Sequence, residues 1–289
     1  MSSFYKRRQL LIVHGNIYVD ALYVNFSGLE ADEYEKGDVL SAQITTTNQS
    51  STEIDDATGS PSKLWTDNKP VSRPPTKLKL IKYKKTSSWC YGVSWREDGN
   101  ILCSTYTDGI EVRSATDLKL FKRINITGVV ISAYSVGGQL ITKVRNADTY
   151  STYIGTESNP QHTLLHQYES DYASQLSVSD SRIVDIDRAS KQLMIYTITG
   201  NHLYNIDISD MRCHHGVHIL PDDNSVLVSD SEYRGGEVRK YKLQDGNDHQ
   251  PVWRCTGLTN PRGITSDQSG LIYVVSFSEK KIYQISPQG

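Results

Sequence analysis

The chain has 289 residues, and its 31 Lys and Arg nearly balance its 33 Asp and Glu, leaving a formal net charge of −2. This balance excludes a histone-like or polybasic nucleic-acid binder, although it allows a local basic patch. Hydrophobic residues make up 37% of the chain, and 20 Gly add to them. This composition is close to the globular average, so most of the chain can bury a core.

Residues 1–75 differ from the rest of the chain. Residues 1–44 hold a strand-like stretch at 10–26, which we interpret as a short β-rich segment or a piece of another domain. Residues 45–75 are rich in Thr and Ser and contain four prolines. With few apolar residues and no periodicity, they are predicted to form a disordered polar linker.

From residue 76 to 289, short strand candidates recur at intervals of about ten residues, a spacing typical of a β-sandwich, barrel or propeller. A unit of roughly 40–47 residues repeats five times, and each copy offers four strands with a tight polar turn between the first two. The copies begin at or near Tyr91, Val129, Gln175, Gly216 and Pro261. This repeat predicts an all-β fold and favours a β-propeller over a sandwich with accidental internal similarity.

The fifth copy carries a resemblance to a known family. Its sequence Pro261-Arg262-Gly263-Ile264, followed by the strands at 270–274 and 281–285, resembles an NHL repeat. The first and fourth copies resemble this repeat more weakly, because they keep Gly-Val and the turn before an apolar strand. Together with the linker and a Lys-rich strand, residues 76–289 look like the C-terminal domain of invertebrate tripartite-motif (TRIM-like) proteins.

The resemblance implies a six-bladed propeller, whereas only five copies can be counted. The segment 76–85 alternates Lys77, Lys79 and Lys82 with apolar residues, a pattern that suits an edge strand. It could supply the fourth strand of the fifth copy and close a five-bladed ring. The alternative, which the family resemblance favours, is an incomplete six-bladed geometry.

The resemblance also implies a function, which is target recognition in a ubiquitin ligase, with RNA binding as the alternative. The RING and B-box zinc modules of tripartite-motif proteins are missing, because no cysteine precedes Cys90. We therefore expect a fragment or a reduced relative that is not catalytic by itself. Ligase activity would need a RING from another chain or from further sequence.

Binding residues are expected in or near the loops, because loops on a rigid scaffold carry function and because Arg and aromatic residues dominate binding hot spots. Residues 76–289 hold 24 basic and 23 acidic residues, so we expect a protein partner first, RNA second, and neither DNA nor a membrane. The candidates for the binding face are Arg96, Arg145, Tyr233, Arg234 and Arg262.

The densest group of potential metal ligands is the segment 213–218, Cys-His-His-Gly-Val-His. On an extended strand His214 and His218 would share one face, with His215 on the other. A metal site would need further ligands from other blades, so we expect no metal and no cofactor here.

An enzyme is the remaining alternative, in the form of a calcium-dependent propeller hydrolase or lactonase. Its oxygen ligands would come from Asp108, Asp185 and Asp230, late in the second strands of their copies. The sequence contains no nucleophile elbow, HExxH motif or phosphate-binding glycine loop. The enzyme hypothesis therefore depends on fold analogy alone.

The sequence also predicts where the protein resides. No apolar run approaches the ~20 residues that span a bilayer, and the run at 10–13 is too short for a signal peptide. The four cysteines, Cys90, Cys103, Cys213 and Cys255, show no zinc-pair spacing and are expected to be free thiols. These features predict a cytoplasmic protein.

Overall fold

The computed structural model describes residues 90–220, 224–232, 235–244, 250–267, 270–278 and 281–287, with Ser88 and three short strands before it. The described chain consists of strands, turns and loops, and it contains no helix. Accordingly, no helix in this part of the chain could cross a membrane. Apart from those short strands, the predicted β-rich segment and polar linker lie outside the described residues.

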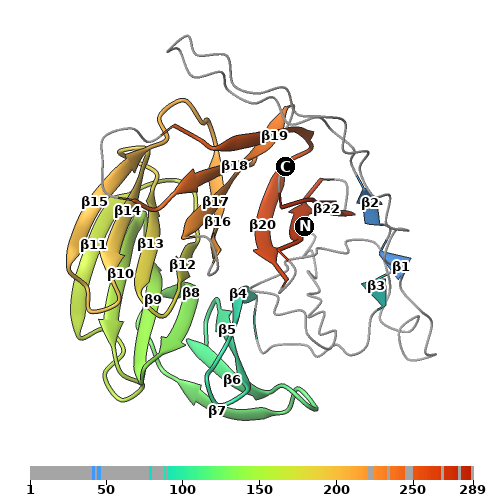
Figure 1. The fold of residues 1–289 in the computed structure, drawn as a ribbon. Coiled ribbons are helices and arrows are strands. Elements are labelled where there is room, and N and C mark those ends of the chain that lie inside the picture. The colour runs from blue at the N-terminus through green and yellow to red at the C-terminus, as the bar shows by residue number, and fades with distance from the viewer. Residues whose placement is uncertain are drawn as a thin grey trace, which may run out of the picture.

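Five four-stranded sheets follow one another along the chain and form the blades of a β-propeller (Figure 1). This confirms the all-β propeller with five countable blades. The first blade comprises β4 (Cys90–Trp95), β5 (Asn100–Thr105), β6 (Ile110–Ser114) and β7 (Leu120–Ile124). The second comprises β8 (Val129–Val136), β9 (Gln139–Asn146), β10 (Thr149–Gly155) and β11 (Thr163–Glu169).

The remaining three blades repeat this order. The third comprises β12 (Leu176–Val178), β13 (Arg182–Asp187), β14 (Gln192–Thr197) and β15 (His202–Asp207). The fourth comprises β16 (His214–Leu220), β17 (Ser225–Asp230), β18 (Gly236–Lys242) and β19 (Trp253–Leu258). The fifth begins with β20 (Pro261–Ser266), β21 (Ile272–Ser276) and β22 (Lys281–Ile285).

The fourth strand of the fifth blade comes from the N-terminal part of the chain. It is β2 (Ile44–Thr46), which pairs with β22 in parallel. Within the Lys-rich segment, β3 (Leu78–Lys79) pairs instead with β1 (Ser41–Ala42). The sequence allowed the Lys-rich segment to pair with the last strand of the fifth copy. In the structure β2 occupies that position beside β22.

The first strand of each blade lies around the centre of the propeller, and the fourth strands of blades one to four lie at its periphery (Figure 1). Successive first strands contact one another, from β4 to β8, β12, β16 and β20. Contact of similar extent between β20 and β4 is not found in the described part of the chain. Of the segment that precedes β4 in sequence, 76–89, only Leu78–Lys79 and Ser88 are described.

Burial explains which residues form which strand. The second strands β5 and β17 are buried on both faces, because neighbouring blades cover them. Each has three consecutive apolar residues at its centre, 101–103 and 226–228. The peripheral strands β7, β11 and β15 are mostly exposed. Apolar clusters fill the interfaces between successive blades, the largest lying between the third and fourth.

Candidate interaction face

The antiparallel order of each blade places alternate loops at opposite ends of the propeller. We call the end at which the first strands begin the strand-start face. It comprises the starts of β4, β8, β16 and β20 and the loops 106–109, 146–148, 170–175, 188–191 and 209–213. The opposite face comprises the loops 96–99, 115–119, 137–138, 156–162, 179–181 and 198–201.

The first strands approach each other closely near this face. A Cβ atom on Gly216 would lie 1.9 Å from the backbone oxygen of Arg262, and one on Gly92 would lie 2.8 Å from that of Ile131. The backbone N–H of Gln175 donates to the backbone oxygen of His215 at 2.9 Å. Residues near the starts of neighbouring first strands are thus in contact. The first strands of these blades therefore begin at the same end of the propeller.

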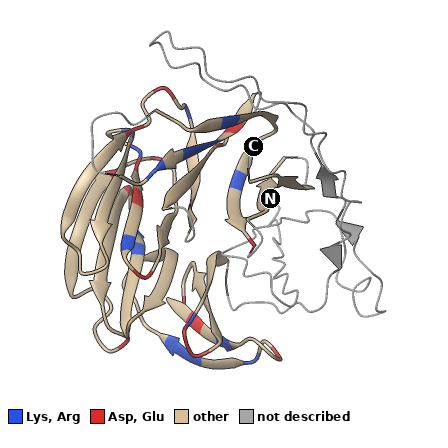
Figure 2. Ribbon diagram, in the orientation of Figure 1, with Lys and Arg blue, Asp and Glu red and all other residues tan. Residues whose placement is uncertain are grey.

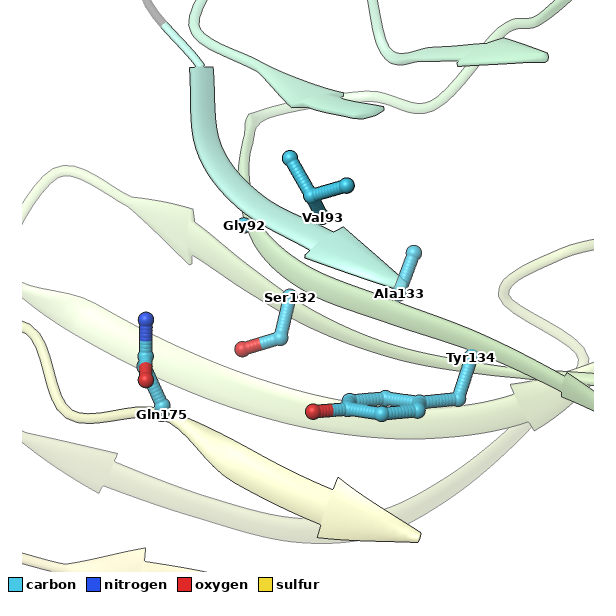
Figure 3. A pocket seen from close by; sticks show the side chains of 6 residues that line it. All are labelled: Gly92, Val93, Ser132, Ala133, Tyr134 and Gln175. Carbon is cyan, nitrogen blue, oxygen red and sulfur yellow. The ribbon is translucent and has the colours of Figure 1, made fainter. Parts of the chain in front are cut away.

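A small pocket marks one of these contacts, where β4, β8 and the residue before β12 meet (Figure 3). Gln175 reaches across it, and its side-chain amide donates to the backbone oxygen of Tyr91 at 3.5 Å. The pocket is too small for a ligand larger than water. This contact therefore offers no binding site of its own.

Arginine side chains lie against aromatic rings in three blades at the strand-start face. The distances from the guanidinium carbon to the ring centroid are 5.8 Å for Arg145 on Tyr150, 5.3 Å for Arg188 on Tyr172 and 3.8 Å for Arg262 on Phe277. In the first blade the rings of Tyr91 and Tyr106 lie 6.3 Å apart. Tyr172 is 65% exposed and Tyr106 is 43% exposed.

The structure separates the residues that the sequence suggested for binding. Arg145, opposite Val129 at the start of β8, and Arg262, in β20, lie at the strand-start face. Arg96 follows the end of β4 and lies at the opposite face, where it pairs with Asp98 at 3.1 Å and with Glu157. Tyr233 and Arg234 lie outside the described residues.

Arg188, Tyr172 and Tyr106 are residues of this face that sequence reasoning did not select. The same rule, Arg and aromatic residues in loops, applies to all three, because they lie in the loops 188–191, 170–175 and 106–109. What the sequence did not reveal is that Arg188 and Tyr172, although 16 positions apart (188 − 172), lie in contact.

His214 and His218 point to opposite sides of their blade, so the prediction that they share a face is wrong. The register of β16 against β17 shifts between His214 and Val217, a β-bulge that reverses the alternation of side chains. The Nε2 atom of His214 bonds the backbone oxygen of Ile208 at 3.0 Å, towards the third blade. That of His218 bonds Oγ of Ser266 at 2.9 Å, towards the fifth.

Burial favours the uncharged form of the three histidines of β16. Burial lowers the pKa of His218 to about 4 and also lowers that of His214. Burial and the nearby cations of Arg262 and Arg188 lower the pKa of His215 to about 3. A neutral imidazole could bind a metal, but no group of three His, Cys, Asp or Glu suited to that lies among the described residues.

The acidic residues proposed for a calcium site are engaged in other contacts. Asp185 is fully buried beside Lys143. The carboxylate of Asp230 accepts backbone N–H groups from Arg212 and Cys213 at 2.8 and 2.7 Å. Asp108 lies in the turn after β5, where Oγ1 of Thr107 donates to it at 3.0 Å.

Lys143 and Asp185 form a buried ion pair between the second and third blades. The ammonium of Lys143 donates to Asp185 at 2.5 Å and to Oγ of Ser174 at 2.8 Å. Thr152 also donates to Asp185, and the hydroxyl of Tyr168 bonds Ser174 at 2.7 Å. Burial alone would lower the pKa of Lys143, but the attraction of Asp185 outweighs it and the pKa lies above its usual range.

Charges of both signs are distributed over the described blades (Figure 2). Several basic residues on the strand-start face have acidic neighbours, such as Arg212 with Glu232 at 2.6 Å and Arg145 with Asp148 at 3.5 Å. Such a mixed surface does not form the continuous cationic track that a nucleic-acid backbone requires.

Comparison with known proteins gives the fold and no more. No family model and no curated protein matches the sequence. A protein of unknown function from Bacteroides caccae has a similar structure, with a TM-score of 0.52 and 14% identity over 73% of this chain and 83% of that one. The computationally designed Ika8 protein superposes with a TM-score of 0.45 and 8% identity over 66% of this chain and 57% of its own.

At these identities the likeness concerns the fold alone. The order of its sheets makes the chain, by class, a five-bladed β-propeller. The resemblance of its units to NHL repeats and to tripartite-motif proteins stays a prediction, because no family match accompanies it.

Proposed function

We propose that this propeller is a non-catalytic protein-interaction module and that its partner binds the strand-start face. The observation that carries the proposal is the set of Arg–aromatic contacts contributed by three blades to one end of the molecule. Arg and Tyr are enriched among residues that dominate binding energy. The loops that present them stand on a rigid scaffold of stacked sheets.

Within this proposal the chain would recognise targets for a ubiquitin ligase, as the resemblance to tripartite-motif proteins implies. A cytoplasmic location belongs to the same proposal and is supported by the four cysteines, which are free thiols. The mixed charge of the face favours a protein over RNA. RNA binding is accordingly treated as an outcome of the experiment.

The experiment uses the full chain as bait in cell extract and compares two matched pairs of substitutions. Tyr106→Ala with Tyr172→Ala removes two exposed rings of the described part of the strand-start face. Phe121→Ala with Leu203→Ala is the control, because these side chains are 73% and 42% exposed but lie on the peripheral strands β7 and β15.

The proposal predicts that bound proteins are lost with the first pair and retained with the second. Loss with the control pair alone, or with neither pair, would contradict it. A second extract treated with nuclease separates the RNA alternative. If the captured material disappears after that treatment, the partner is RNA and the protein-binding proposal is overturned.

A further inference from the structure

Arg188 lies in the turn between β13 and β14, and contacts from two other segments hold its guanidinium in place. Its NH1 group donates to the backbone oxygen of His214 at 2.7 Å, and its NH2 group lies 3.5 Å from Sγ of Cys213. The ring of Tyr172 covers it at 5.3 Å. A guanidinium fixed in this way loses little further freedom when a ligand binds.

The positive charge of Arg188 is not balanced by a carboxylate in the described part of the chain, since its partners there are a carbonyl, a thiol and a ring. Nearby acids are engaged elsewhere. Asp187 pairs with His166 at 3.1 Å. Asp230, which lies opposite His214, accepts the backbone N–H groups of Arg212 and Cys213 at 2.8 and 2.7 Å. A half-buried cation with neutral neighbours favours an anion from outside the chain.

A second cation lies nearby, two blades further on. The guanidinium of Arg262 is stacked 3.8 Å from the ring centroid of Phe277, and its Nε donates to Oδ1 of Asn260 at 3.4 Å. Arg188 and Arg262 are both close enough to His215 to lower its pKa. The ring of His215 is therefore uncharged, and both guanidiniums contribute positive charge near it.

Arg188 also has donors to spare. A guanidinium carries five N–H groups in a planar fork, and the contacts with His214 and Cys213 engage two of them. A planar fork binds a carboxylate through two parallel hydrogen bonds. The exposed ring of Tyr172 beside it offers apolar contact to the rest of an incoming side chain.

We propose that the partner presents an acidic side chain, Asp or Glu, which binds Arg188 in the part of the strand-start face that lies around Tyr172, His215 and Arg262. This inference rests on the protein-binding function proposed above and names the chemistry of the partner. A carboxylate is favoured over a nucleic-acid phosphate because the face mixes both signs of charge, whereas phosphate tracking needs a run of cations.

The test starts from a library of random peptides displayed on phage and selected on the full chain. The affinity of a selected peptide is then measured by fluorescence anisotropy for the wild type, for Arg188→Gln and for Arg212→Gln. Arg212 is the matched control, because it lies on the same face but is already paired with Glu232. Glutamine at 188 removes the positive charge and keeps a polar side chain.

We expect the selected peptides to share an Asp or Glu. Arg188→Gln should weaken binding about tenfold or more, as expected for a charged hydrogen bond. Replacing the shared acid of the peptide by its amide should weaken binding equally, and the two changes together should cost no more than either alone. Arg212→Gln should change the affinity by less than about threefold.

The outcomes separate this inference from the proposed function. Peptides that lose binding with the Tyr106→Ala and Tyr172→Ala pair, but need neither an acid nor Arg188, would overturn the acidic partner and leave the protein-binding face standing. Peptides that bind all these variants equally, or no selected peptides at all, would count against both. Binding of a single-stranded RNA probe that depends on Arg188, without any acidic peptide, would also overturn the inference.

Discussion

Lys143 and Asp187 illustrate how single residues hold this propeller together, since both are buried charged groups at the same pair of blades. Lys143 reaches Asp185 and Ser174 from β9. Asp187 accepts from His166 at 3.1 Å and from the backbone N–H groups of the turn that follows β13. Each charge has several partners, and removal of the oppositely charged one leaves a buried ion without a counter-ion.

Lys143→Met should therefore lower the free energy of unfolding by about 3–5 kcal/mol, because it leaves the Asp185 carboxylate buried without a counter-ion. The control is Lys122→Met, since Lys122 is 39% exposed in its pair with Glu157 and exposed pairs contribute about 0–1 kcal/mol. Urea denaturation measures both. Equal effects of the two substitutions would contradict the importance of the buried pair.

Asp187 makes the free energy of unfolding depend on pH in the acidic range. Burial alone would raise its pKa, but hydrogen bonds from His166 and Ser190 outweigh burial and bring the pKa to about 2, below the usual 3.8. The stabilisation is thus fully present above about pH 4 and is lost as the pH falls towards 2. The stability difference between wild type and Asp187→Asn should be smaller at pH 3 than at pH 5, and a constant difference would contradict this.

At the scale of strands, close approach near the centre constrains the first strands. Gly216→Ala would place a Cβ 1.9 Å from the backbone oxygen of Arg262, whereas Gly92→Ala would leave 2.8 Å to that of Ile131. We expect losses of about 3 kcal/mol or more for Gly216→Ala and about 1–3 kcal/mol for Gly92→Ala. Thermal or urea unfolding of both variants tests this order, and a reversed order would contradict it.

The strands also show what could be predicted from the sequence. Turn chemistry located the hairpins correctly in the described part: Gly137 and Gly138, for example, both have the positive φ that a type I′ turn requires. The bulge in β16 could not be predicted from the sequence, because the pattern of polar and apolar residues does not show where a strand contains an extra residue. That one residue sends His214 and His218 to different blades.

The position of Arg96 could have been predicted. A residue that follows the first strand of a blade must lie at the end opposite to one that precedes it, because each blade is an antiparallel meander. Arg96 follows β4, whereas Arg262 lies at the start of β20 and Arg145 lies opposite the start of β8. The contact of Arg188 with Tyr172, in contrast, depends on how the loops of the third blade fold back, which strand periodicity does not encode.

At the scale of the whole molecule, the five sequence repeats form the five blades, and the order of strands in each blade determines which loops form the strand-start face. Five units of similar length give five sheets, and the equivalent start of each first strand brings loops from different blades to one end. Sequence reasoning recovered the units, while the fourth strand of the fifth blade came from residues expected to precede the propeller. A parallel pairing over such a distance in sequence leaves no local signal.

Hydrogen–deuterium exchange of the full chain, alone and with its captured protein or selected peptide, tests the central claim most directly. We predict slower exchange in the strand-start loops 146–148, 170–175 and 188–191 when the partner is bound, and unchanged exchange in the opposite loops 96–99, 156–162 and 198–201. Protection confined to the opposite loops, or to the peripheral strands β7, β11 and β15, would contradict the assignment of the strand-start face as the interaction surface.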